Sequence, residues 1–185
     1  MKRSRAHLLF CCVILAGLMI SCNQVFVFKK TLSLNDKEFK VESKPGLKTD
    51  SLKVELILPA GEKFVLEREI DRKIYAAEIA DLDANNVPEI YIYGKSNDGD
   101  EYGDVYSFTA NNDGSLTEIF VPTLDPYISR GYMGHDKFDV SGSYLNRQFK
   151  VAQDVNSEGS QRVKYAISKS AVGLYLNEIK VLPPH

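Results

Sequence analysis

The sequence predicts an all-β protein, an antiparallel β-sandwich or barrel of about ten short strands in a single domain. Apolar and polar residues alternate in many short segments, and turn-forming residues separate these segments. No long segment shows the 3.6-residue period of an amphipathic helix. Together these three features favour strands over helices throughout the chain.

The expected strands follow one another at short intervals. Most alternate an apolar with a polar residue, as a strand with one solvated face does. One segment, Ile90 to Tyr93, is apolar at every position, which indicates an interior strand covered on both faces. The stretch 31–50 is more polar, and we expect part of it to be loop. The expected strands are 39–42, 52–58, 90–93, 145–151 and 162–168.

Turns are expected where glycine stands beside proline, asparagine, aspartate, serine or glutamate. These sites are Lys44-Pro45-Gly46, Asn97-Asp98-Gly99, Asn112-Asp113-Gly114, Ser141-Gly142 and Glu158-Gly159.

The first residues read as a secretion signal. Three basic residues precede an apolar run of 13 residues, from Leu8 to Ile20. A membrane-spanning helix needs about 20, so this run fits a signal peptide better than a membrane anchor. The following residues, Leu18 to Cys22, resemble a bacterial lipobox, and a plain signal peptide cut nearby is the alternative.

The lipobox reading divides the chain into three parts. Residues 1–21 would be a lipoprotein signal peptide, 22–35 a lipidated N-terminus and tether, and 36–185 the β domain. Acyl chains on Cys22 would hold the protein on a membrane. We therefore expect a lipid-anchored protein of the bacterial cell envelope, on the outer membrane and facing the periplasm.

Composition excludes several classes of function. Removal of residues 1–21 takes away three of the 23 Lys and Arg and none of the 25 Asp and Glu, which leaves a net charge near −5. An acidic chain without a basic block is not expected to bind nucleic acid. The remaining part keeps one cysteine, Cys22, so it is not a disulfide scaffold. It keeps two histidines, His135 and His185, too few for a multi-histidine metal centre.

One acidic segment could bind calcium. Asp81, Asp83 and Asn85 place oxygen-bearing side chains on alternate residues, and Glu89 follows. A tight turn can aim such side chains at a hard cation. The same residues are explained by a loop that caps its own backbone in Asx turns, so we expect no cofactor and keep calcium as the alternative.

The segment 96–104 holds four carboxylates around Tyr102. Paired carboxylates can catalyse glycoside hydrolysis, but this requires an apolar setting that raises one pKa above the other, and none is present. A solvated hairpin tip explains the segment equally well. The third interpretation is a projecting recognition loop in which Tyr102 is the anchor and Gly99 and Gly103 allow close backbone approach.

The segment 131–138 contains His135 beside Asp136, which could be a base and its orienting partner. Adjacent residues on a strand point to opposite faces, so the pair would not hydrogen-bond there. No nucleophile elbow or catalytic cysteine accompanies it. We therefore expect no enzymatic activity and a histidine that ties two loops together; a hydrolase is the weaker alternative.

Three tracts resemble the periplasmic inhibitors of invertebrate-type lysozyme. The resemblance covers about residues 75–168, and the third tract is the most specific. The tracts are Asp81-Leu82-Asp83 through Tyr91; Gly99 to Gly103 with Val105 to Phe108; and Gly131 to Phe138 with Leu145 to Phe149 and Arg162 to Tyr165.

The resemblance implies an antiparallel β protein that inserts a loop into the lysozyme substrate cleft. Related inhibitors share a Ser-Gly-x-x-Tyr pattern in that loop, and Gly99 and Tyr102 match its glycine and tyrosine. Asp98 stands where the pattern has serine, and an ionised carboxylate accepts hydrogen bonds but donates none. Ser96 is the nearby hydroxyl that could donate instead. A second loop would assist through Tyr132, His135 and Asp136.

The expected partners are thus a lysozyme, of the invertebrate type, and the membrane reached through Cys22. Both a monomer and a homodimer are compatible with the sequence. The alternative function is an envelope module that binds another protein or a glycan and is stabilised by calcium.

Overall fold

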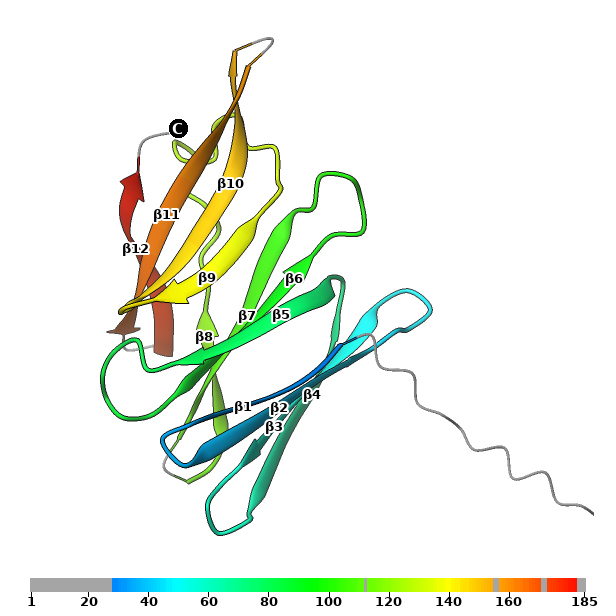
Figure 1. The fold of residues 1–185 in the computed structure, drawn as a ribbon, viewed down its shortest axis with the longest axis vertical. Helices are drawn as coiled ribbons and strands as arrows, with labels where there is room; N and C mark the ends of the chain where they lie inside the picture. The colour runs from blue at the N-terminus through cyan, green and yellow to red at the C-terminus, as the bar shows by residue number, and fades with distance from the viewer. Residues whose placement is uncertain (1–27, 112, 155–156, 171–172, 183–185) are drawn as a thin grey trace, which may run out of the picture.

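The computed structural model describes residues 28–111, 113–154, 157–170 and 173–182. Their regular secondary structure is entirely β, in twelve strands that form one domain with two sheets (Figure 1). This confirms the predicted all-β class. The strands are β1 (Phe28–Leu34), β2 (Lys37–Lys44), β3 (Asp50–Ile57), β4 (Lys63–Ile70), β5 (Lys73–Ala80), β6 (Glu89–Lys95), β7 (Gly103–Ala110), β8 (Leu116–Phe120), β9 (Lys137–Ser141), β10 (Tyr144–Asp154), β11 (Ser157–Ser170) and β12 (Gly173–Leu182).

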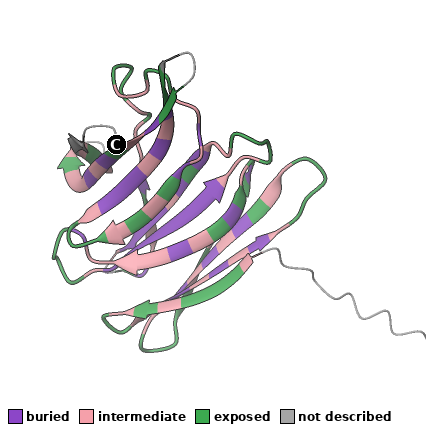
Figure 2. Ribbon diagram, turned by 45° about the horizontal axis from the view of Figure 1, so that its top comes forward, coloured by how far each residue is buried: buried purple, intermediate pink, exposed green. Residues whose placement is uncertain are grey.

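The smaller sheet has the order β1-β2-β3-β4, with every neighbouring pair antiparallel. Alternate residues of β2 and β3 are fully buried, among them Phe39 and Leu56, while the residues between them reach solvent (Figure 2). The buried face packs against β5, β6 and β7 and forms a first hydrophobic core with Ile90, Ile92 and Phe108. The alternation of the sequence therefore separates the core from the solvated face.

The larger sheet has the order β5-β6-β7-β8-β12-β11-β10-β9 and curls around a second core. This core includes Tyr91, Tyr165 and Phe149. Its two edge strands, β5 and β9, approach each other, so the sheet is a nearly closed barrel. At this seam Glu78 of β5 accepts hydrogen bonds from the Val140 backbone N–H (2.9 Å) and from the Tyr93 hydroxyl (2.6 Å).

β6 lies between the two cores. Ile90 and Ile92 point into the first and Tyr91 and Tyr93 into the second, and all four are at most 1% exposed. The prediction of an interior strand covered on both faces is confirmed. The acidic turn 81–88 precedes β6 and the loop 96–102 follows it, so these two segments lie at opposite ends of this strand.

The expectation that part of 31–50 is loop is confirmed: residues 35–36 and 45–49 lie between strands, while 31–34 and 37–44 are strand. Three details of the expectation are corrected. Residues 28–34, assigned to the tether, form β1, because Phe28 and Leu32 pack on the first core. Glu158 and Gly159 lie within β11 instead of in a turn. Finally, one strand pair, β8 with β12, is parallel.

The expected signal peptide, the lipid site Cys22 and residues 22–27 of the tether lie outside the described residues. In the part of the chain that is described, no helix has the length and apolar character needed to cross a membrane.

Candidate functional site

Two loops far apart in the sequence meet at one end of the larger sheet. The β6–β7 loop (96–102) projects beyond its strands, next to the segment that leads into β9 (Figure 1). The His135 N–H donates a hydrogen bond to the Asp100 carbonyl at 2.7 Å, and the Asp136 N–H donates to the Glu101 carbonyl at 3.4 Å. The fold thus brings together the two loops that contain the candidate site residues predicted from the sequence.

Two glycines allow this close approach. A Cβ on Gly134 would collide with the Asp100 carbonyl, and Gly134 has a φ of +72°, which few other residues adopt. A Cβ on Gly103 would collide with Asp136 and with the Phe138 ring. Gly99, in contrast, has no atom near its Cβ direction. The contact between the loops therefore depends on Gly103 and Gly134.

Asp136 fixes the second loop to the first. Its side chain is fully buried and accepts hydrogen bonds from the Gly103 N–H (2.7 Å), Arg147 Nε (2.7 Å) and the Tyr132 hydroxyl. A buried carboxylate is stable only when it is paired and hydrogen-bonded, and Asp136 is both. Its place in the site is therefore that of an internal anchor; the side chain is not a surface contact.

Arg147 is a central residue that the sequence reasoning did not single out. It is 9% exposed, and its guanidinium lies 5.5 Å from the ring centres of Tyr132 and Phe138. The alternation of apolar and polar residues could have identified it. Arg147 lies two residues after Leu145 and two before Phe149, both of them core residues, so it occupies an inward-facing position of the strand. A charge at an inward position requires a buried partner, and Asp136 is that partner.

The tip of the β6–β7 loop is exposed and acidic. Residues 97–100 are all exposed and include Asp98 and Asp100. Behind the tip, Ser96 organises the loop: its hydroxyl donates to Asp98 Oδ1 at 2.5 Å and accepts from the Tyr102 N–H at 2.8 Å. The single hydroxyl proton of Ser96 is thus used within the loop, and Asp98 serves as its acceptor.

Tyr102 lies behind this tip and is half-buried. Its ring packs against Tyr132, with ring centres 5.4 Å apart, and Tyr132 in turn packs edge-on against Phe149 of the core. The negative charge of nearby Asp100 raises the pKa of the Tyr102 hydroxyl. The residues that project furthest are therefore the acids, and Tyr102 forms the wall behind them.

The two loops also meet through a strained pair of residues. Glu101 and His135 both have positive φ, +48° and +54°, which is uncommon outside glycine. Glu101 forms an ion pair with Lys95, and its Oε2 lies 3.7 Å from His135 Nδ1. The hydrogen bond from Lys95 lowers the pKa of Glu101. A general acid requires a raised pKa, so the lowered pKa of Glu101 does not suit that role. Backbone strain such as the positive φ of Glu101 and His135 is common at binding sites.

The acidic turn lies at the other end of β6, and its side chains mostly close the turn itself. Asp81 accepts hydrogen bonds from the Asn85 and Asn86 N–H groups, at 3.0 and 2.9 Å. Asn85 donates its side-chain amide to Asp83 at 2.9 Å, and its Oδ1 accepts from the Val87 N–H at 2.6 Å. The bond from the Val87 N–H to Asn85 Oδ1 is an Asx-turn contact, and the two bonds to Asp81 cap the backbone further along the turn.

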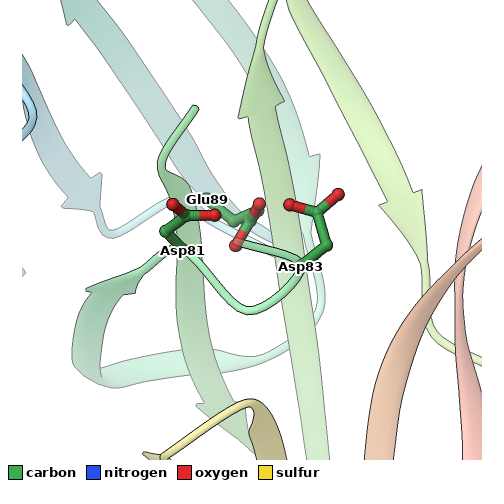
Figure 3. A group of neighbouring side chains, drawn as sticks. All are labelled: Asp81, Asp83 and Glu89. Carbon is green, nitrogen blue, oxygen red and sulfur yellow. The ribbon is translucent and has the colours of Figure 1, made fainter. Parts of the chain in front are cut away.

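Within the described residues, three carboxylates of this turn come together: one oxygen each of Asp81, Asp83 and Glu89 lies within 4.8 Å of the others (Figure 3). Glu89 thus joins the aspartates in place of Asn85. It is 1% exposed and accepts a hydrogen bond from the Leu82 N–H at 2.8 Å. Burial, and after it the charges of Asp83 and Asp81, raises the pKa of Glu89 to about 7.

Comparison with known proteins adds no relative: no protein-family model matches the chain, and no curated protein matches it.

Proposed function

We propose that the protein is a lipid-anchored, non-enzymatic inhibitor of a lysozyme, of the invertebrate type, in the bacterial cell envelope. In this proposal the acidic tip of the β6–β7 hairpin enters the substrate cleft of the enzyme, and the protein is held at the membrane through Cys22. The observation that carries the proposal is the exposed tip at residues 97–100 on a base fixed by the second loop.

A fixed base supports inhibition because an ordered loop loses little conformational entropy on binding. Hydrogen bonds from His135 and Asp136 hold the carbonyls of Asp100 and Glu101, and the Asp136–Arg147 pair joins this base to the barrel core. These contacts fix the base of the loop, which supports insertion as a preformed element.

Charge supports a cationic partner. Many lysozymes are cationic because they act on anionic cell walls, and an acidic inhibitor would associate with them faster by electrostatic steering. Asp98 and Asp100 would face the cationic rim of the cleft. They would avoid its catalytic carboxylates, since two carboxylates ~4 Å apart repel by about 4 kcal/mol at an effective dielectric constant near 20.

The test measures lysozyme activity in the presence of the purified chain from Asn23 onward. We expect inhibition of an invertebrate-type lysozyme, and we expect Tyr102→Ala to weaken it by at least about 2 kcal/mol, as loss of an interface anchor does. Tyr127→Ala is the matched control, because Tyr127 is 92% exposed and lies outside both loops. Absence of inhibition of every lysozyme type at micromolar concentration would contradict the proposal.

A further inference from the structure

A groove of about 650 Å³ is lined by residues of β7 and β8 and includes part of the candidate site. Its lining also includes Arg147 and Phe138, Arg68 of β4, and Asp71 and Arg72 in the turn that follows β4. Phe120, at the end of β8, lines the groove as well. This volume is in the range of sites that hold a small ligand.

The charges of the groove are paired along its length. Arg68 Nη2 lies 2.9 Å from Glu118 Oε1, and Arg72 Nε lies 2.9 Å from Asp104 Oδ2. Arg72 is also 2.9 Å from Asp71, and Arg147 is paired with Asp136. Because each guanidinium has a carboxylate beside it, the groove has no strong field of either sign, and neither an anion nor a cation is favoured.

These pairs still offer hydrogen bonds. A guanidinium has five N–H donors and a carboxylate about four acceptor sites, more than one ion pair uses. The Asp104 side chain is 51% exposed and Arg72 is 25% exposed, so both can be reached from the groove. Burial raises the pKa of Asp104, while the charges of Arg72 and Arg147 act in the opposite direction.

Phe120 supplies an apolar surface in the same groove. It is 63% exposed, whereas Tyr106 is covered by the Arg68 guanidinium 5.0 Å from its ring centre. A free aromatic ring beside paired donors and acceptors matches a pyranose, which has an apolar C–H face and a rim of hydroxyls. Among the described residues, the β8-side edge of β7 is unpaired over Gly103–Tyr106, because the β7–β8 ladder joins only Ser107–Ala110 to Leu116–Ile119. An extended peptide added at this edge is therefore the competing occupant.

We propose that this groove binds a neutral oligosaccharide, with one sugar ring on Phe120 and its hydroxyls hydrogen-bonded to the Arg72–Asp104 pair. Tyr102 and Tyr132 of the candidate site line part of this groove, whereas the exposed tip at residues 97–100 does not. The sugar contacts proposed for Phe120 and the Arg72–Asp104 pair do not depend on the inhibitor proposal. The occupied groove would tie the protein to a glycan while the tip stays free.

The test is calorimetric titration of the protein, purified with its native N-terminus, with four neutral tetrasaccharides: those of β-1,4-linked N-acetylglucosamine, β-1,4-linked glucose, α-1,4-linked glucose and α-linked mannose. We expect at least one to bind with a dissociation constant below about 1 mM. Phe120→Ala and Asp104→Asn should each weaken this binding at least about tenfold, whereas Phe120→Tyr should retain it.

Tyr127→Ala is the matched control, since Tyr127 is also exposed but is not part of the groove. Thermal unfolding of each variant verifies that it folds. The proposal is overturned if none of the four sugars binds at about 5 mM, or if Tyr127→Ala weakens binding as much as Phe120→Ala does. Measuring lysozyme inhibition by Phe120→Ala separates the two proposals. The tip at residues 97–100 is intact in this variant, so it should lose sugar binding and still inhibit the enzyme.

Discussion

Glu89 couples the acidic turn to pH. In the unfolded chain its pKa is near the ordinary 4.5, and in the folded protein burial raises it to about 7. Below pH 4.5 Glu89 is protonated in both the folded and the unfolded state, so its titration does not change the free energy of unfolding there. Between these values the unfolded state ionises first, and the free energy of unfolding falls as pH rises, by about 3 kcal/mol in total. Above pH 7 this loss is complete and constant.

We therefore expect Glu89→Gln to flatten the pH dependence of stability. The amide oxygen of glutamine can still accept the Leu82 N–H, but it does not titrate. Urea unfolding at pH 4.5, 6 and 8 measures the difference between the proteins. Glu118→Gln, an exposed change on β8, should keep the wild-type slope. The same slope in Glu89→Gln and in the wild type would show that another group causes it.

Arg147 and Asp136 form the buried ion pair of the candidate site. Arg147→Met leaves the Asp136 carboxylate in the interior without its guanidinium, and such a loss costs about 3–5 kcal/mol of unfolding free energy. Arg162→Met is the matched control, because Arg162 is exposed on β11, where its guanidinium donates a hydrogen bond to Gln148 Oε1 at 3.0 Å. We expect this change to cost less than about 1 kcal/mol. Equal costs in a denaturant titration would contradict this assignment.

Residue patterns predicted part of this site. The turn residues and Tyr102 located the β6–β7 loop, and the pair His135-Asp136 located the second. The contact between the two loops could not be predicted from the residues alone. The hydrogen bond between His135 and Asp100 spans 35 positions, and it depends on how β9 pairs within the sheet. The resemblance, rather than periodicity, placed both loops in one site.

At the scale of elements, the seam between β5 and β9 is closed by side chains. Glu78 accepts the Val140 N–H and the Tyr93 hydroxyl, and the Tyr93 ring stacks on Phe138 of β9 at 5.5 Å. A carboxylate here takes the place of the backbone carbonyls that a closing strand would supply. The seam is therefore the part of the barrel with the fewest ladder hydrogen bonds.

Glu78→Ala should open this seam locally. It leaves two partly buried donors without an acceptor, at about 1–3 kcal/mol each. Hydrogen exchange of the Val140 amide should accelerate, while that of amides in the paired centre of β10 should change less. Glu67→Ala, which removes an exposed ion pair with Lys53, is the control and should leave Val140 unchanged. Unchanged exchange at Val140 in Glu78→Ala would contradict the proposed closure.

At the scale of the whole molecule, alternation predicted strands but not how they join. A period of two shows which face of a strand is buried, and it identified β6 as interior because both faces are apolar. It does not show which strands pair. The parallel contact of β8 with β12 joins Ile119 to Leu174, 55 positions apart, so the choice between sandwich and barrel required the structure. In the structure, the four-stranded sheet packs against the eight-stranded sheet, and the eight-stranded sheet curls into a nearly closed barrel.

The most direct measurement is the inhibition constant of Asp98→Asn/Asp100→Asn against an invertebrate-type lysozyme at low and physiological salt. If the acidic tip enters a cationic cleft, this double variant should inhibit at least about tenfold more weakly than the wild type, most of all at low salt. Asp113→Asn, on the exposed turn after β7, should change the constant less than about twofold. An unchanged constant in the double variant, or an equal loss in Asp113→Asn, would contradict the central claim.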